Sequence, residues 1–307
     1  MNKSFTLIEI LVVIVIIGVL SAFVLVGMSS ITTSANITKS KAFSDSLRNS
    51  LLINLVSEWK LDGNTNDSWG NNNGTWSGPA GSNTTANWRL ESECVSNGCL
   101  AFDGTDDYVE VIGSDVSTSN LAITGAITLG GWVKMNDLSL YNVGLFSRGR
   151  GAGINANYGY SVSWQDATPN TKIYFDTYST TTRDSLYTVA NPIKDNNWHY
   201  VIATWDGTMN TNGKKIYLDG ILIKEKTSTI GSLGTPNYNF RIGKDYYLGF
   251  LNGSIDNALI YNNVLSISQI KQNYFIGVNK LFKNRRIAFN DFNERIIKLK
   301  PNLTSNE

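Results

Sequence analysis

The sequence has 307 residues, with 26 Lys and Arg, 25 Asp and Glu and one His, so its formal net charge is +1. A chain of this length holds one large or two ordinary domains, and its balanced charge excludes a generally basic nucleic-acid-binding protein. Aromatic residues make up 11% of the chain, which is too many for a disordered protein, and a single histidine disfavours His-based metal and catalytic sites.

The first predicted element is a hydrophobic helix over residues 5–28, in which Glu9 is the only charged residue. A helix of this length spans about 36 Å, enough to cross a hydrocarbon core of about 30 Å. Lys3 precedes the helix, and a cationic start favours an N-terminus that stays in the cytoplasm. The sequence therefore predicts a single transmembrane helix with the rest of the chain outside the cytoplasm.

Glu9 is unusual in such a helix, because a carboxylate inside a membrane costs several kcal/mol unless it is paired or neutralised. One interpretation places Glu9 near the cytoplasmic interface, where the charge is tolerated. The neighbouring residues support another, since the segment Lys3–Ile14 resembles the N-terminus of type IV prepilins and pseudopilins. In that family a short basic leader ends in a small residue and is followed by Phe-Thr-Leu-Ile-Glu and a hydrophobic helix.

This resemblance implies processing and assembly. Prepilin peptidase would cleave between Ser4 and Phe5, so that residues 1–4 are a leader peptide, and would methylate the new amino group of Phe5. Glu9 would pair with the N-terminal amine of a neighbouring subunit, because two buried opposite charges together escape the penalty that each incurs alone. Ser4 stands where the family usually has glycine. The implied partners are prepilin peptidase, other pilin-like subunits through this helix, and the membrane before assembly.

Residues 29–54 are predicted to continue as an amphipathic helical stalk. The segment 29–53 lacks Pro and Gly, and its apolar residues recur at helical spacing. In pilin-like proteins the same helix continues to the globular head, and the alternative is a solvated stalk. Both interpretations make this segment a spacer.

From residue 55 onward, short apolar or alternating runs are separated by Gly, Asn, Asp and Ser. This pattern predicts an antiparallel β-sandwich of the jelly-roll type over residues 55–276. A type I′ hairpin is expected at Asp219-Gly220, because glycine accepts a positive φ at little cost. The expected strands are Val56–Leu61, Leu100–Phe102, Tyr108–Val111, Ala126–Met135, Gly144–Ser147, Gly159–Trp164, Lys172–Thr177, Trp198–Trp205, Lys215–Leu218, Ile221–Glu225, Phe240–Ile242 and Ser254–Tyr261.

The order of several segments in this region resembles concanavalin A-like, laminin-G-like jelly-roll domains. No single segment is specific, but their order is. The resemblance implies a mainly β protein in which a long N-terminal helix carries a laminin-G-like head. The matching segments are Ala101–Gly104, Asp107–Val109, Thr128–Val133, Trp198–Val201, Thr204–Gly207, Tyr217–Gly220 and Gly253–Tyr261.

Many laminin-G-like domains hold one calcium ion, so the resemblance implies a calcium site in this head. By resemblance, its candidate ligands are Asp67, Asn72 and Asp256, with Asp103 as a further one. Calcium takes six to eight oxygen ligands from carboxylates, amides and backbone carbonyls. The alternative is that these residues only form Asx turns.

Cys94 and Cys99 are the only cysteines, and an extracytoplasmic location favours a short loop closed by a disulfide over two free thiols. His199 is predicted to be a strand residue, because no Ser or Cys partner motif accompanies it. No Glu-x-Asp-x-x-Glu run occurs either, and we predict that the protein is not an enzyme.

Exposed aromatic residues could stack on sugar rings, and the candidates are Trp69, Trp76, Trp88 and Tyr158.

Residues 277–307 form a basic tail with seven Lys and Arg against three Asp and Glu, a net charge of +4. Apolar residues of the tail fall on one face of a predicted helix, which would contact a membrane, an acidic partner or the head itself. These residues are Phe282, Phe289, Phe292, Ile296 and Leu299. The alternative is a loosely ordered tail.

Together these features predict a minor or specialised type IV pilin-like filament subunit that displays an adhesive, glycan- or protein-binding head. It would reside first in the cytoplasmic membrane and then in an extracellular filament or at the cell surface. Two alternatives stay open: a pseudopilin of a type II secretion system, and a membrane-anchored carbohydrate-binding protein that does not polymerise.

Overall fold

The computed structural model describes residues 52–77, 88–138, 142–149, 159–165, 170–190, 192–235, 237–246 and 249–299. Ser4, Phe5, Glu9, the predicted transmembrane helix and nearly all of the predicted stalk therefore lie outside the described residues. The chain divides into two compact units, Met1–Ile53 and Asn54–Glu307. Within the part that is described, no helix is long and apolar enough to cross a membrane.

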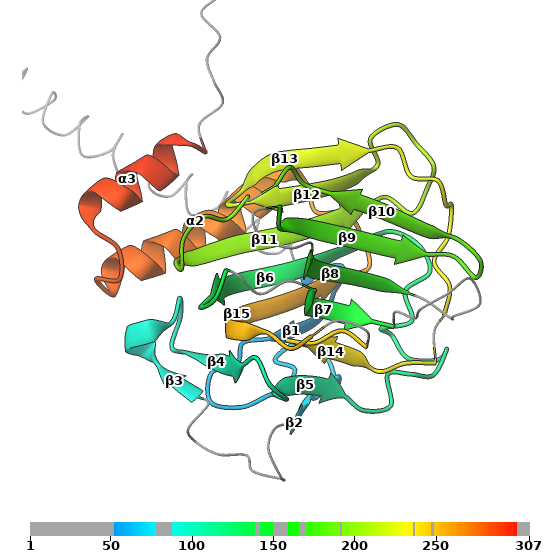
Figure 1. Cartoon of the computed structure of the whole chain (residues 1–307), viewed down its shortest axis with the longest axis horizontal. Coiled ribbons are helices and arrows are strands. Elements are labelled where there is room, and N and C mark those ends of the chain that lie inside the picture. Colours follow the sequence, from blue (N-terminus) through cyan, green and yellow to red (C-terminus); the bar gives the residue numbers. More distant parts are fainter. Residues whose placement is uncertain are drawn as a thin grey trace, which may run out of the picture. The chain divides into compact units, whose positions relative to one another are not determined.

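Two antiparallel sheets form the second unit (Figure 1). Sheet A has the strand order β13-β12-β11-β6-β15-β4-β3, with β1 beside β15, and sheet B has the order β10-β9-β8-β7-β14-β5-β2. The strands of sheet A are β1 (Leu55–Trp59), β3 (Trp88–Leu90), β4 (Gly98–Asp103), β6 (Ile127–Met135), β11 (Trp198–Trp205), β12 (Lys214–Leu218), β13 (Ile221–Lys226) and β15 (Asn252–Tyr261). Those of sheet B are β2 (Thr75–Ser77), β5 (Tyr108–Val111), β7 (Val143–Arg148), β8 (Tyr160–Gln165), β9 (Lys172–Tyr178), β10 (Arg183–Tyr187) and β14 (Phe240–Ile242).

The core lies between the two sheets, where alternate residues of each strand point inward. Trp59, Trp164 and Trp205 are at most 1% exposed and anchor it. Trp59 stacks on Phe240 with ring centroids 5.1 Å apart, which joins β1 of sheet A to β14 of sheet B. Burial of such large rings is a major source of stability in a sandwich of this kind.

All twelve expected strands are present, each with ends within two residues of the prediction. The predicted hairpin is also confirmed, since Asp219 and Gly220 both have positive φ and Leu218 pairs with Ile221. Three further strands were not predicted: β2 and β3 are only three residues long, and β10 is largely polar. An alternating pattern of hydrophobic residues cannot reveal β10, because one of its two buried residues is Asp184.

Two helices follow β15: α2 (Ile267–Lys283) and α3 (Phe289–Ile297). Helix α2 starts with a capping box between Ser266 and Gln269 and packs on the outer face of sheet A, where Tyr274 stacks on Trp132 at 5.5 Å. Helix α3 turns back, and Phe282 contacts Phe289 and Phe292. The predicted boundary between head and tail at residue 276 falls inside α2, and the described part of the tail packs on the head.

Candidate functional site

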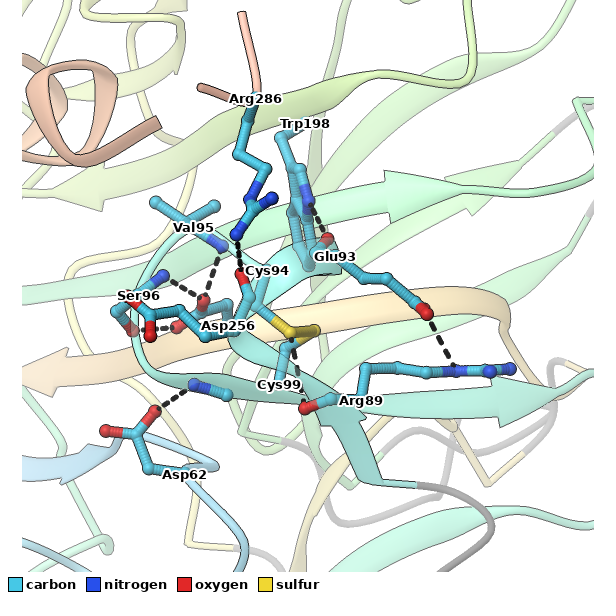
Figure 2. The surroundings of a disulfide bond; sticks show 12 residues. Asp62, Arg89, Glu93, Cys94, Val95, Ser96, Cys99, Trp198, Asp256 and Arg286 are labelled. Carbon is cyan, nitrogen blue, oxygen red and sulfur yellow. Dashed lines mark hydrogen bonds and ion pairs between the residues drawn. A yellow bond between two sulfur atoms is a disulfide. The ribbon is translucent and has the colours of Figure 1, made fainter. Parts of the chain in front are cut away.

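The loop between β3 and β4 is closed by a disulfide between Cys94 and Cys99. Asp256 of β15 lies beneath this loop and is fully buried (Figure 2). Its carboxylate accepts hydrogen bonds from the backbone N–H groups of Val95 and Ser96, each at 2.9 Å, and from the Ser96 hydroxyl. Burial raises the pKa of Asp256 to about 7, although the bonds from Ser96 act in the opposite direction. Asp256 therefore holds the disulfide loop against sheet A.

The same loop is a junction for other parts of the sandwich (Figure 2). Trp198 Nε1 donates to the carbonyl of Glu93 at 2.9 Å, and Arg286 Nη2 donates to the carbonyl of Glu91 at 2.7 Å. Strand β11 and the segment between α2 and α3 are thus both tied to this loop, which points to a structural role for it.

Asp67 and Asn72 share a different turn. Asp67 Oδ1 accepts backbone N–H groups from Glu58, Trp69 and Gly70, each at 3.0 Å, and its Oδ2 accepts the N–H of Asn72 at 3.1 Å. The chain itself thus hydrogen-bonds both carboxylate oxygens, as in the Asx-turn interpretation. Asp67 and Asp256 are not among the described acidic, His and Cys residues whose ligand atoms gather in a group of three or more within 4.8 Å of one another.

Asp103, Asp106 and Asp107 do gather in this way, in the loop between β4 and β5. Asp107 is 1% exposed and accepts the backbone N–H of Asp103, and Asp103 accepts that of Thr105. Oδ1 of Asp106 is buried without a hydrogen-bond partner in the described part of the chain. Burial and the charge of Asp103 raise the pKa of Asp107 to about 6. Three carboxylates that repel one another supply the oxygen ligands that calcium prefers, so this loop fits such an ion better than the turn at Asp67 does.

We predict that calcium raises the melting temperature of the protein through this loop. Saturation a hundredfold above the dissociation constant would add about 2.7 kcal/mol. Thermal unfolding with calcium and with EDTA measures the shift, which Asp106→Asn should reduce. Asp67→Asn is the matched control and should keep the shift. An equal shift in both variants, or none in the wild-type protein, would contradict this assignment.

An aromatic patch lies on the outer face of sheet B. Val109 and Ile242 point into the core, so Tyr108 of β5 and Arg241 of β14 point to the opposite face. The patch consists of Tyr108, Tyr238, Arg241, Lys244, Tyr246 and Phe250, all of them half-buried.

Cations and rings alternate in this patch. Arg241 Cζ lies 3.6 Å from the ring centroid of Tyr246 and 4.9 Å from that of Tyr108. Lys244 Nζ lies 3.9 Å from the ring centroid of Phe250. No sequence pattern indicated this patch, because only the pairing of β5 with β14 brings Tyr108 beside residues more than a hundred positions later.

The predicted sugar-stacking residues are scattered. Trp69 is 48% exposed, Trp76 and Trp88 pack against the core, and Tyr158 lies outside the described residues.

Both ring nitrogens of His199, in β11, face carboxylates: Nδ1 is 2.7 Å from Asp219 and Nε2 is 3.0 Å from Asp195.

Burial opposes the charge of His199, but hydrogen bonds to Asp219 and Asp195 outweigh it and raise the pKa of the imidazole. The ring lines a cavity of about 400 Å³, which also touches Tyr274 and Arg295. Since both nitrogens are engaged by carboxylates, the arrangement positions the turn between β12 and β13 against β11.

Comparison with known proteins yields two family matches. The prokaryotic N-terminal methylation motif matches residues 1–25, and the concanavalin A-like lectin/glucanases superfamily matches residues 103–271. A search of curated protein sequences gave no match.

Similar solved structures share the fold at low identity. Domain 4 of AbnA, a GH43 extracellular arabinanase from Geobacillus stearothermophilus, in complex with arabinotriose, has a TM-score of 0.50 and 18% identity, and the match covers 71% of this chain and 97% of that domain. The botulinum neurotoxin serotype D binding domain has a TM-score of 0.52 and 15% identity, covering 73% of this chain and 51% of that one. The serotype G binding domain has a TM-score of 0.51 and 16% identity, with 73% and 51% covered. This chain thus spans about half the length of the neurotoxin binding domains that it matches.

Both resemblances noted in the sequence are therefore confirmed, one in residues 1–25 and the other in residues 103–271. The superfamily match covers more than half of the sequence, and the two-sheet antiparallel sandwich agrees with it. The chain belongs to the concanavalin A-like lectin/glucanases superfamily and carries a prokaryotic N-terminal methylation motif at its start.

Proposed function

We propose that this protein is a pilin-like filament subunit that presents a lectin-type binding head at the cell surface. The observation that carries the proposal is the presence of both matches in one chain, the methylation motif at residues 1–25 and the sandwich at residues 103–271. Processing by prepilin peptidase would free Phe5, and the hydrophobic helix would pack with those of other subunits. The head would then face outward.

The head binds a ligand rather than transforming one. Support comes from the aromatic patch on the outer face of sheet B and from the saccharide complex of the similar arabinanase domain. Aromatic rings beside a few polar groups are typical of ligand sites. A glycan on a neighbouring cell or surface is the ligand class that these features favour.

The test of assembly is the charge at Glu9. Glu9→Ala should remove the subunit from sheared surface filaments, because the N-terminal amine of its neighbour loses its buried partner. Quantitative immunoblots of filament and membrane fractions measure this, and mass spectrometry should find an N-methylated Phe5. Glu294→Ala, at an exposed carboxylate of α3, is the control and should assemble normally.

Three results would contradict parts of this proposal. If Glu9→Ala enters filaments as efficiently as the wild-type protein, the proposed pair between Glu9 and the neighbouring N-terminal amine is wrong. An intact Met1 would favour a protein that is anchored without polymerising. Processed protein that never reaches a surface filament would favour the secretion pseudopilin.

A further inference from the structure

Lys244 is a cation held among aromatic rings. Its Nζ lies 3.9 Å from the ring centroid of Phe250 and 4.9 Å from that of Tyr108, and these two centroids are 6.2 Å apart. Within the residues that the structure describes, no carboxylate forms an ion pair with this ammonium and no acceptor hydrogen-bonds to it. Aromatic faces attract a cation, but they leave the three N–H donors of a lysine unmatched.

The carboxylate whose charge acts on Lys244, that of Glu110, is already paired with Arg241. Glu110 Oε1 accepts a hydrogen bond from Nε of Arg241 at 2.8 Å, and Nη2 of Arg241 forms an ion pair with the same oxygen at 2.8 Å. Arg241 is also enclosed between Tyr246 and Tyr108. Glu110 thus neutralises Arg241, and Lys244 keeps its charge available.

The surroundings of Lys244 make that charge costly. Burial lowers the pKa of Lys244 and the like charge of Arg241 lowers it further, with only Glu110 acting in the opposite direction. An anion bound at Lys244 would offset the free-energy cost of the charged ammonium and would accept hydrogen bonds from its N–H donors.

Other cations of the sandwich are instead paired with carboxylates. Arg183, on the outer face of β10, is paired with Asp176 at 2.8 Å. Lys226 reaches Asp184 at 2.6 Å. Lys244 thus combines neighbouring rings with an unneutralised charge, which suits a ligand that has both an apolar face and an anionic group.

A sugar ring with a carboxylate or sulfate has this combination, since its C–H face packs on aromatic rings. We propose that the aromatic patch binds an acidic saccharide, with its anionic group at Lys244 and its ring face on Tyr108 or Phe250. This inference rests on the proposed function, because it specifies the ligand class of the same head.

The experiment measures binding of oligosaccharides to the full-length protein in detergent, by calorimetry or interferometry. The probes are an oligogalacturonate, its neutral methyl ester and a sulfated galactan oligomer, each at two salt concentrations with calcium or EDTA. The wild-type protein should bind an acidic probe at least about tenfold more tightly than the ester, as expected for hydrogen bonds to a charged group. The oligogalacturonate and the sulfated probe separate a carboxylate ligand from a sulfate one. The higher salt concentration should weaken binding of both anionic probes.

Two variants test the residue itself. Lys244→Met keeps the aliphatic stem and should lose the preference for the acidic probe, whereas Lys244→Arg keeps the charge and should retain it. Circular dichroism and the unfolding midpoint show that each variant is folded. Tyr108→Ala should weaken binding of the acidic probe and of the ester together, because it removes the stacking surface and leaves the cation.

Unchanged affinity of Lys244→Met for the acidic probe would overturn the inference. Equal affinity of the wild-type protein for the oligogalacturonate and for its methyl ester would also overturn the inference. In that case the proposal of a glycan-binding head would stand, but with a neutral ligand. Preference for an acidic peptide over every saccharide would overturn the ligand class. Assembly of the subunit into filaments is measured separately through Glu9, so these results leave that part of the proposed function standing.

Discussion

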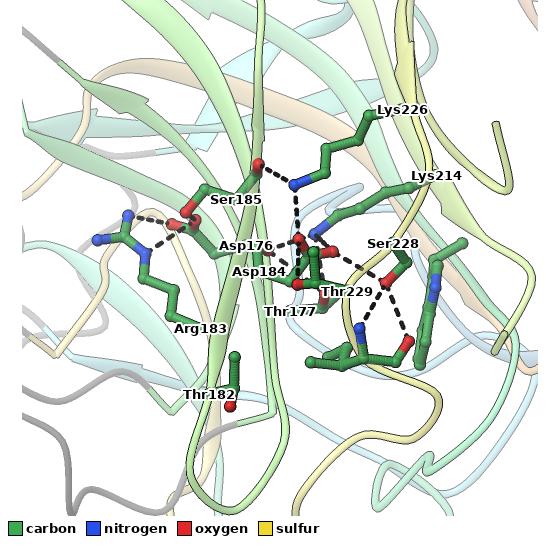
Figure 3. A network of polar contacts seen from close by, with 12 residues as sticks. Asp176, Thr177, Thr182, Arg183, Asp184, Ser185, Lys214, Lys226, Ser228 and Thr229 are labelled. Carbon is green, nitrogen blue, oxygen red and sulfur yellow. Dashed lines mark hydrogen bonds and ion pairs between the residues drawn. The ribbon is translucent and has the colours of Figure 1, made fainter. Parts of the chain in front are cut away.

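Replacement of Asp184 by alanine is expected to lower the free energy of unfolding by about 3–5 kcal/mol, because it leaves a buried lysine charge without its partner. Asp184 lies on β10, at the edge of sheet B, and is 2% exposed, and Lys214 of β12, in sheet A, is fully buried (Figure 3). Few single substitutions in a domain of this size should cost as much.

The network around Asp184 joins the edges of the two sheets. Oδ1 accepts from Lys226 Nζ at 2.6 Å and from Thr229 at 3.0 Å. Oδ2 accepts from Ser228 at 2.9 Å and lies 3.4 Å from Lys214 Nζ. Lys214 also donates to the hydroxyl of Thr177 and to the carbonyl of Asp184. Lys214, Lys226, Ser228 and Thr229 all contact the carboxylate of Asp184. Loss of this carboxylate therefore leaves several polar groups without a partner.

Urea unfolding measures the effect, and two variants control it. Lys226→Met removes a lysine whose side chain is 32% exposed, so it should cost much less than Lys214→Met, which leaves Asp184 without its buried partner. The double variant Asp184→Ala with Lys214→Met should recover part of the loss, because it leaves no buried unpaired charge. A loss below about 1 kcal/mol in Asp184→Ala would show that water solvates this cluster.

The network also predicts a pH dependence. Burial by itself would raise the pKa of Asp184, but the charge of Lys214 and hydrogen bonds from Lys226 and Ser228 bring it down to about 2. The folded state therefore binds this proton less readily than the unfolded chain, and the stabilisation is present above about pH 4 and is lost as the pH falls towards 2. Burial also lowers the pKa of Lys214 to about 8, against the attraction of Asp184. Asp184→Ala should flatten the acid limb of the stability curve.

Replacement of Gly277 by alanine is expected to destabilise the protein by about 1–3 kcal/mol. The usual sign is the opposite, since glycine in the middle of a helix costs about 1 kcal/mol relative to alanine. A Cβ at Gly277 of α2 would lie 2.2 Å from Cζ2 of Trp132 and 2.5 Å from its Cε2. Trp132 cannot move aside easily, because its ring packs on Tyr200 at 5.3 Å and on Tyr274 at 5.5 Å.

Denaturant unfolding, with near-ultraviolet circular dichroism for the packing of Trp132, measures this effect. A Cβ at Gly125 would meet nothing within 4 Å, so Gly125→Ala is the control and should change little. Trp132→Phe removes the ring atoms that the new Cβ would meet, so the cost of Gly277→Ala should be smaller in that background. Stabilisation by Gly277→Ala would mean that α2 does not pack on sheet A as closely as its contacts with Trp132 indicate.

The sequence alone determined the features that depend on neighbours along the chain. Apolar alternation indicated twelve strands, and Asp219-Gly220 indicated one hairpin turn between them, because backbone preference and one buried face act over a few residues. The methylation motif is likewise a continuous segment, and its family match agrees with the interpretation of Phe5 and Glu9 as parts of a prepilin N-terminus. The spacing of Cys94 and Cys99 also indicated the disulfide that the structure contains.

Tertiary structure decided which polar and aromatic side chains meet. Strand β10 looks polar in sequence, yet Asp184 is buried because Lys214 and Lys226 reach it from the other sheet. The aromatic patch exists because β5 pairs with β14, which places Tyr108 beside Arg241 and Lys244. In both cases the deciding interaction joins residues far apart in sequence. Neither hydrophobic periodicity nor turn chemistry predicts such pairs, since each depends only on residues that are close together in sequence.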